Sequence, residues 1–255
     1  MKISEGSFVL FFYNGDKKWL IKVEKEKILH THIGIIDVGS TIDLDYGSFV
    51  ITNKDKKVYL LPPSIHDFVM KSQRSTQIVY PKDYGYIAAR SGLRNGFRVL
   101  EIGTGSAALA TFMASIVMPE GHVYTFDVND EFMSIAKKNL DKSGMSEFVT
   151  LSHYDTEEIS QIKDVDLVII DLGDPWRYLD VVYPCMKSGS SVVCICPTMN
   201  QLEKLATQFF PSGFIDIECV ETFLRRVEAR EGKTRPSMRM IGHTTYLGFA
   251  RKVLK

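Results

Sequence analysis

The sequence predicts an α/β protein in which a doubly wound, mostly parallel sheet follows a small antiparallel β domain. Two patterns along the 255 residues support this prediction. Short apolar runs separated by Gly-, Asp- and Lys-rich breaks fill residues 7–61, as is typical of antiparallel strands. From about residue 97 strands and helices alternate, which indicates a parallel sheet wound with helices. We therefore predict a β domain over 1–63, a connecting segment over 64–96 and a Rossmann-like domain over 97–255.

The N-terminal region begins with a hairpin. Asn14-Gly15 separates its first two apolar runs, and this dipeptide is a strong signal for a tight β turn. The strands predicted in this region are 7–13, 18–23, 33–38, 48–52 and 58–61. Pro62-Pro63 closes the region, and we expect a connecting helix over about 64–70.

The second region alternates in a regular way. The predicted strands are 98–102, 122–126, 148–152, 166–171 and 191–196. The predicted helices are about 106–117, 130–141, a segment after Pro175, and 199–210. Two late strands, 214–223 and 245–251, are expected to pair antiparallel at the edge of the sheet. Such a late hairpin is more typical of the methyltransferase variant of the doubly wound fold than of dehydrogenases.

Composition sets the broad class. The chain is 45% hydrophobic and 24% charged, as in an ordinary soluble protein, and no apolar run reaches the ~20 residues of a membrane span. Residues 1–7 lack the shape of a signal peptide, so we expect a cytoplasmic protein without membrane contact. The four cysteines show no zinc spacing, and no metal site is predicted.

The net charge is zero, so any nucleic-acid binding must depend on a local basic patch. One cluster near the C-terminus could form such a patch, although a solvated charged loop is an equally good interpretation. Its basic residues are Arg225, Arg226, Arg230, Lys233, Arg235 and Arg239.

A glycine turn follows the first strand of the second region. Val99-Leu100-Glu101 leads into Gly103-Thr-Gly105 and then into a run of small residues. Glycines there tolerate positive φ and let a ligand approach the backbone, and the amides of the following helix then face the ligand. Dinucleotides and S-adenosylmethionine both use such a turn. Glu101 favours S-adenosylmethionine, because a carboxylate would repel a pyrophosphate but can help to hold the amino end of a methionine moiety.

Carboxylates end four successive strands of this region. They are Glu101, Asp127, Asp155 and Asp171. Ligands bind outside the carboxyl ends of strands in open α/β sheets, so all four are candidate site residues. Asp127 is placed to accept hydrogen bonds from a ribose, and Asp155 from an adenine amino group. Each of them could instead cap the helix that follows it.

The segment Asp171-Leu-Gly-Asp-Pro-Trp176 is the second candidate motif. It resembles, without matching, the Asp/Asn-Pro-Pro-Tyr/Trp loop of adenine-N6 methyltransferases, which holds the exocyclic amine of the base. Asp171 would then lie beside the methyl donor, and Trp176 could offer an aromatic face to the base. A plain turn at the start of a helix is the alternative.

Four segments together resemble the tRNA (adenine-N1)-methyltransferases, which modify adenosine 58, and in some archaea also adenosine 57, of the T-loop. The segments are 75–83 with Tyr-Pro-Lys-Asp, 101–109, 171–176, and 235–247 with Gly-His-Thr. The resemblance covers nearly the whole chain. This sequence has Gly105-Ser-Ala107 where the family usually has Gly-Ser-Gly, Leu172-Gly173 where it usually has Leu-Pro, and Asp127 where it often has Glu.

The resemblance implies a class I S-adenosylmethionine-dependent methyltransferase fold, tRNA as the substrate and a homotetramer. Asp171 would be the catalytic carboxylate, with Tyr80 at the mouth of the base pocket. The implied cofactor-binding residues are Gln77, Glu101, Gly103, Gly105, Ser106, Ala107, Ala108, Leu109, Asp127, Phe132, Asp155 and Asp171. Arg235, Arg239 and Trp176 would contact RNA.

Three other functions remain open at this point. An NAD-dependent dehydrogenase is disfavoured by Glu101 and by the lack of a proton-relay motif. A non-catalytic RNA-binding subunit is disfavoured by the retained acids Asp127, Asp155 and Asp171. An N6-adenine or protein methyltransferase would share the fold, and the fold alone does not exclude it.

Overall fold

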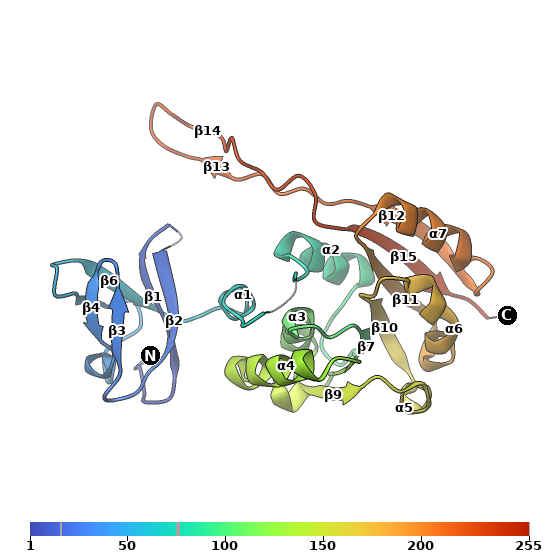
Figure 1. Ribbon diagram of the computed structural model, residues 1–255, viewed down its shortest axis with the longest axis horizontal. Coiled ribbons are helices and arrows are strands. Elements are labelled where there is room, and N and C mark those ends of the chain that lie inside the picture. Colours follow the sequence, from blue (N-terminus) through green and yellow to red (C-terminus); the bar gives the residue numbers. More distant parts are fainter. Residues whose placement is uncertain (16, 75–76, 255) are drawn as a thin grey trace. The chain divides into compact units, whose positions relative to one another are not determined.

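The computed structural model describes residues 1–15, 17–74 and 77–254 (Figure 1). It divides into two compact units, Met1–Lys71 and Ser72–Lys255. The segment 64–96 is therefore split, since its first helix belongs to the first unit and its second helix to the second. No helix formed by the described residues has the length and apolar character that a membrane span requires.

The first unit is built from antiparallel strands. Its elements are β1 Phe8–Asn14, β2 Lys17–Lys22, β3 Ile28–Thr31, β4 Gly34–Asp37, β5 Phe49–Ile51, β6 Lys57–Leu61 and α1 Ile65–Met70. One sheet has the order β2-β1-β6-β5, and β3 and β4 form a separate hairpin. Alternate apolar side chains such as Val9 and Phe11 are fully buried in its core. Strand β3 was not predicted.

The second unit contains the doubly wound sheet. Its strands are β7 Arg98–Ile102, β8 His122–Asp127, β9 Val149–His153, β10 Val165–Ile170, β11 Met186–Cys196, β12 Phe214–Val220 and β15 Tyr246–Lys252. They lie in the order β12-β15-β11-β10-β7-β8-β9. The five strands from β11 to β9 run parallel, whereas β15 runs antiparallel to both β11 and β12. The predicted fold class, including the late antiparallel strands, is confirmed.

Helices cover both faces of this sheet. They are α2 Pro81–Ser91, α3 Ala108–Val117, α4 Asp130–Ser143, α5 Thr156–Gln161, α6 Leu179–Val182 and α7 Met199–Phe209. Helix α3 contacts α2 and α4 on one face, and α5, α6 and α7 supply apolar side chains to the core on the other face. Along β7 the residues alternate between these faces, with Leu100 and Ile102 in the core beside α5–α7.

A long segment, residues 221–245, connects β12 to β15, and we call it the arm (Figure 1, orange). Within it, β13 Val227–Glu228 and β14 Arg235–Pro236 pair only with each other. Large apolar side chains of the arm are exposed rather than buried. They are Phe223, Leu224, Val227, Met238, Met240 and Ile241.

Candidate active site

The course of the chain through the large sheet reverses at β7 and β10. From β7 the chain continues outward through β8 and β9, and it returns to the other side of β7 as β10. Two backbone hydrogen bonds connect the loops at the carboxyl ends of these strands. The Asp171 amide donates to the Ile102 carbonyl (2.8 Å), and the Gly103 amide donates to the Phe126 carbonyl (2.9 Å). Ligands of open α/β sheets bind at such a switch point.

A pocket of about 390 Å³ lies at this edge. It is lined by the loops that follow β7, β8 and β10 and by the segment before α2. The residues singled out from the sequence that line it are Gln77, Glu101, Gly103, Gly105, Ser106, Ala108, Leu109, Asp127, Phe132 and Asp171. The pocket also contains Ile78, Val79, Thr104, Val128, Asn129 and Leu172, which sequence reasoning missed.

The glycine turn is shaped by its contact with the loop after β10. Gly103 has φ +102°, and a Cβ there would collide with the carbonyl of Asp171. Ala107 is fully buried and also has a positive φ, +60°, at the N-cap of α3. The left-handed conformation costs a residue with a Cβ about 1–2 kcal/mol, so the turn tolerates strain where the resembled family usually has glycine.

Asp127 holds two loops with one carboxylate. Its Oδ2 accepts a hydrogen bond from the Gly105 amide (2.8 Å), and its Oδ1 accepts one from the Asn129 amide (3.0 Å). The side chain is almost fully buried at the end of β8. Asp127 therefore fixes the glycine turn against the loop that leads into α4.

Glu101 is buried beneath the glycine turn. It accepts a hydrogen bond from the Thr125 hydroxyl, which is also 2.6 Å from the hydroxyl of Thr104. Burial raises the pKa of Glu101 to about 8, with smaller contributions from the charges of Asp171 and Asp127. Its carboxyl group is therefore largely protonated at neutral pH.

Asp171 follows β10 and lines the same pocket. Burial raises the pKa of Asp171 to about 6, and the charge of Asp127 adds to this. A carboxyl group with this pKa is mainly ionised at pH 7 yet close to the range in which it can accept a proton.

The pocket suits a positively charged ligand. Three carboxyl groups line it, and among its described lining residues there is no lysine, arginine or histidine. A sulfonium and an ammonium group would offset the like charges of Asp127 and Asp171 and would favour the ionised form of Glu101. A pyrophosphate would add to their repulsion, so the residues present fit S-adenosylmethionine better than a dinucleotide.

Asn139 connects the pocket wall to the segment before α2. Its side-chain amide donates to the carbonyls of Ser106 (2.9 Å) and Gln73 (2.8 Å), and its Oδ1 accepts from the Gln73 amide (3.1 Å). Asn139 is buried on the face of α4 that carries Ile135. A polar residue on an otherwise apolar helix face is the sequence signal that could have identified it.

Four residues expected at the site lie outside the pocket lining, and Asp155 and Trp176 are two of them. Asp155 is exposed at the N-cap of α5, where its Oδ1 accepts from the amides of Glu157 (2.7 Å) and Glu158 (3.3 Å). These bonds correspond to the second interpretation of the sequence, in which Asp155 caps the helix that follows it. Trp176 packs against the core under α5–α7, and the Lys204 ammonium lies 4.3 Å from the centre of its ring.

Tyr80 caps the N-terminus of α2 through its backbone carbonyl and also does not line the pocket. Ala107 is fully buried and does not line the pocket either. Of the motif over 75–83, Ser75 and Thr76 lie outside the described residues.

The Tyr-Pro-Lys-Asp and Gly-His-Thr motifs meet in space although they are remote in sequence. Asp83 is fully buried and accepts hydrogen bonds from Lys82 (2.7 Å), Thr222 (2.6 Å) and Thr244 (2.9 Å). Thr222 and Thr244 belong to the two ends of the arm. The network therefore fixes the base of the arm to the start of α2.

The two arginines predicted to contact RNA are exposed on the arm. Arg235 pairs with Glu228 (3.3 Å), which lies opposite it in the two-stranded ribbon. For Arg239, no ion pair is found within the described part of the chain. That part also contains no group of three or more His, Cys, Asp or Glu side chains arranged to hold a metal ion.

Residues 56–235 match the family described as the tRNA methyltransferase complex GCD14 subunit. A relative from Methanocaldococcus jannaschii is 33% identical over 92% of this chain and 91% of its own length. The chain belongs to this family. The M. jannaschii relative is named tRNA (adenine(57)-N(1)/adenine(58)-N(1))-methyltransferase TrmI.

Two solved methyltransferase structures are similar to this chain over its whole length. The tRNA (m1A58) methyltransferase TrmI of Aquifex aeolicus is 30% identical, with a TM-score of 0.86 and full coverage of both chains. A Thermotoga maritima structure described as a SAM-dependent O-methyltransferase is 36% identical, with a TM-score of 0.94 over 100% of this chain and 96% of its own. The predicted family and the methyltransferase class are confirmed, and the dehydrogenase alternative is not supported.

Proposed function

We propose that this chain transfers a methyl group from S-adenosylmethionine to N1 of adenosine 58 in the T-loop of tRNA. The names of the M. jannaschii and A. aeolicus relatives support this substrate, and the former adds adenosine 57 as a second target. The observation that carries the proposal is the position of Asp171 at the switch point, in a pocket whose other acids favour a positively charged ligand. Burial also raises the pKa of its carboxyl group.

Residues of the pocket divide between holding the cofactor and shaping the site. When bound, S-adenosylmethionine supplies an electrophilic methyl group on sulfur. Glu101 and Gln77 would contact its methionine end, and Asp127 its ribose. Phe132 would border the adenine, while Gly103, Gly105 and Ser106–Leu109 would approach it through the backbone. Asp155 as an acceptor for the adenine amine stays a prediction.

Asp171 addresses the chemical difficulty of the reaction. The N1 of adenine is a weak nucleophile, and its methylation creates a cation. A carboxylate that accepts a hydrogen bond from the N6 amine donates electron density toward N1 and stabilises the developing charge. Because this interaction is stronger in the transition state than in the ground state, it accelerates the reaction.

The base must leave its stack to reach the pocket. Tyr80 directly follows Gln77–Val79, which line the pocket, and we expect its ring to hold the base by stacking at the mouth. Trp176 is a weaker candidate because its ring is covered by Lys204 and the core. Arg235 and Arg239 would bind the backbone of the tRNA.

The assembly and location of the protein are part of the same proposal. The exposed apolar side chains of the arm support a homotetramer in which the arm is covered by a neighbouring copy. We place the protein in the cytoplasm, where free tRNA is available.

The test is methyl transfer to unmodified tRNA by the Asp171→Asn and Asp171→Ala variants. Loss of one preorganised group of this kind typically slows catalysis about 10²–10³-fold. We expect a loss of this size in the formation of 1-methyladenosine, measured by mass spectrometry of nucleosides, with fragment mapping to position 58. Binding of S-adenosylmethionine, measured by calorimetry, should remain.

Asp180→Asn is a matched control, because Asp180 is exposed on α6 and does not line the pocket. Its rate should equal that of the unmodified chain. Full activity of Asp171→Ala would refute the catalytic role of Asp171. Methylation of a different atom or nucleoside by the unmodified chain would refute the proposed substrate.

A further inference from the structure

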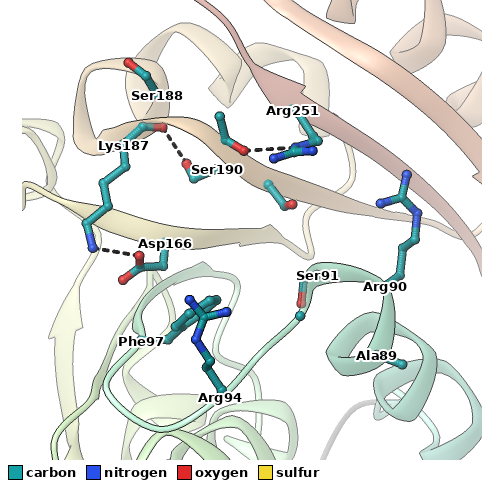
Figure 2. Close-up of a pocket in the computed structure, with 13 residues that line it drawn as sticks. Ala89, Arg90, Ser91, Arg94, Phe97, Asp166, Lys187, Ser188, Ser190 and Arg251 are labelled. Atoms are coloured by element: carbon teal, nitrogen blue, oxygen red, sulfur yellow. Dashed lines mark hydrogen bonds and ion pairs between the residues drawn. The ribbon is translucent and has the colours of Figure 1, made fainter.

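A second cavity, of about 410 Å³, lies at the opposite edge of the large sheet (Figure 2). Its wall includes Phe97 and Asp166, at the amino ends of β7 and β10, and Arg251, near the carboxyl end of the antiparallel β15. Asp166 lies near the start of β10 and Asp171 directly follows its last residue, which places them about 16 Å apart at roughly 3.3 Å per residue. The cavity is therefore separate from the pocket that contains Asp171.

The wall of this cavity is basic. Arg90, Arg94, Lys187 and Arg251 line it, whereas Asp166 is its one acid among the described residues. Asp166 is already bound, since it accepts hydrogen bonds from Lys187 (2.7 Å) and from the Arg98 amide (2.9 Å). Arg90 forms ion pairs with Glu218 and with Asp216 (3.3 Å), so the positive charge of the wall that is not paired with an acid of the described residues belongs to Arg94 and Arg251.

Two arginines keep donors available for a ligand. The guanidinium of Arg94 lies over the Phe97 ring, 4.5 Å from its centre (Figure 2), and in the described part of the chain it has no ion pair. Arg251 donates through Nε to the Gly189 carbonyl (2.9 Å), which leaves its terminal nitrogens without an acceptor among the described residues. Both side chains are thereby held in place before a ligand arrives.

The strand β11 forms the other wall. Its pairing with β10 jumps from Met186 opposite Val165 to Ser191 opposite Leu167, so the intervening residues bulge out of the ladder. Serine residues of this bulge line the cavity. The Ser190 hydroxyl stabilises the bulge by donating to the Lys187 carbonyl (2.7 Å). Apart from Ala89, Phe97 and two glycines, the residues that line the cavity have polar or charged side chains.

We propose that this cavity binds a phosphate group. Planar guanidinium groups match the oxygens of a phosphate in bidentate fashion, and the hydroxyls of Ser188 and Ser191, which line the cavity, supply further donors. The phosphate could come from the backbone of the tRNA, an identification that depends on the proposed function, or from free inorganic phosphate. The sheet then has a cation-binding pocket at its carboxyl edge and a phosphate site at its amino edge.

The experiment compares the unmodified chain with Arg94→Gln, Arg251→Gln and the double variant. Lys138→Gln is the control, because Lys138 is exposed on α4 and lines neither cavity. Far-ultraviolet circular dichroism and S-adenosylmethionine affinity establish that each variant is folded. Pyrophosphate at constant ionic strength should raise the unfolding midpoint of the unmodified chain and of Lys138→Gln by about 2–4 °C near ten times its Kd. The double variant should show no such rise.

The second measurement is the salt dependence of tRNA binding. If the ligand is an RNA phosphate, each arginine variant should weaken binding and reduce the salt slope by about 1, and pyrophosphate should compete. If the ligand is free phosphate, the midpoint shift should depend on the arginines while tRNA affinity does not change. Either result supports the site, and a loss of tRNA affinity without a measurable pyrophosphate shift also supports it.

The proposal is overturned if neither measurement responds to Arg94 and Arg251, or if Lys138→Gln has the same effects as they do. These outcomes are distinct from failure of the proposed function. That failure would be the absence of 1-methyladenosine with the unmodified chain, and it would leave the pyrophosphate result intact.

Discussion

At the scale of single residues, His243 is held by two groups that can only accept hydrogen bonds. Its Nδ1 lies 2.7 Å from a carboxylate oxygen of Glu221, and its Nε2 lies 2.9 Å from the Pro197 carbonyl. Both ring nitrogens must donate to satisfy these partners, so the geometry requires the charged imidazolium. The hydrogen bond to Glu221 raises the pKa of His243, the Pro197 carbonyl raises it further, and the nearby charge of Lys82 opposes them.

This arrangement predicts a pH dependence at the base of the arm. Because the pKa of His243 is higher in the folded than in the unfolded chain, its stabilising contribution is fully present below about pH 6.5. The contribution is lost as the pH rises through the folded-state value. We expect an NMR titration of the imidazole, assigned with His243→Gln, to give a pKa above 6.5, and Glu221→Gln to lower it. A pKa below 6.5 in the unmodified chain would contradict the doubly bonded geometry.

At the scale of elements, the helix α5 concerns an acid, Asp155, whose position in the sequence is consistent both with capping this helix and with binding the adenine of a cofactor. A carboxylate after β9 is expected near the adenine of a cofactor, yet Asp155 bonds the first free amides of α5. A helix of six residues depends strongly on such a cap, because half of its amides have no partner within the helix. The structure therefore favours capping.

Two substitutions separate capping from adenine binding. Asp155→Ala should lower the free energy of unfolding by about 0.5–2 kcal/mol, whereas Asp155→Asn should change it little because asparagine is also a good N-cap. Chemical denaturation measures both. If Asp155 only caps α5, neither variant changes the Kd for S-adenosylmethionine. Weaker cofactor binding by both variants, with stability unchanged, would instead assign Asp155 to the adenine.

The strands of the doubly wound sheet could be predicted because each is a short apolar run that ends in a turn signal. Helix α2 was not predicted, because Gly85 within it weakens the helical pattern. Pro81 stands at its first position, where proline is favoured, and was the signal that could have indicated its start. The bulge in β11 was also missed and only the 191–196 part of that strand was predicted, because a polar run such as 187–190 looks like a loop.

The candidate site was predictable to the extent that it depends on strand ends. Glu101, Asp127 and Asp171 end parallel strands, and topology alone brings them to one edge of the sheet. The contacts of Asp83 with Thr222 and Thr244 join residues more than a hundred positions apart, and no local pattern encodes them. The cavity at the amino edge of the sheet could not be predicted for the same reason, since its arginines come from separate elements.

At the scale of the whole molecule, the two edges of the large sheet have opposite character. Acids surround the pocket at the carboxyl edge, and arginines and a lysine surround the cavity at the amino edge. A polyanionic substrate would be attracted to the amino edge and repelled by the carboxyl edge. The target base is therefore expected to enter the acidic pocket only as a neutral ring, with its phosphates held elsewhere.

The arm has two separable properties, exposed apolar side chains and arginines. We expect Leu224→Asp combined with Ile241→Asp to dissociate the proposed homotetramer, because a buried unpaired carboxylate opposes association. Native mass spectrometry should then show the 28.9 kDa chain in place of an assembly four times heavier. An unmodified chain that is monomeric at micromolar concentration would contradict the tetramer.

Arg239→Glu, which changes charge on the same arm, should leave the assembly intact but weaken tRNA binding and reduce its salt dependence. An unchanged salt slope for Arg239→Glu would remove that residue from the RNA-binding surface.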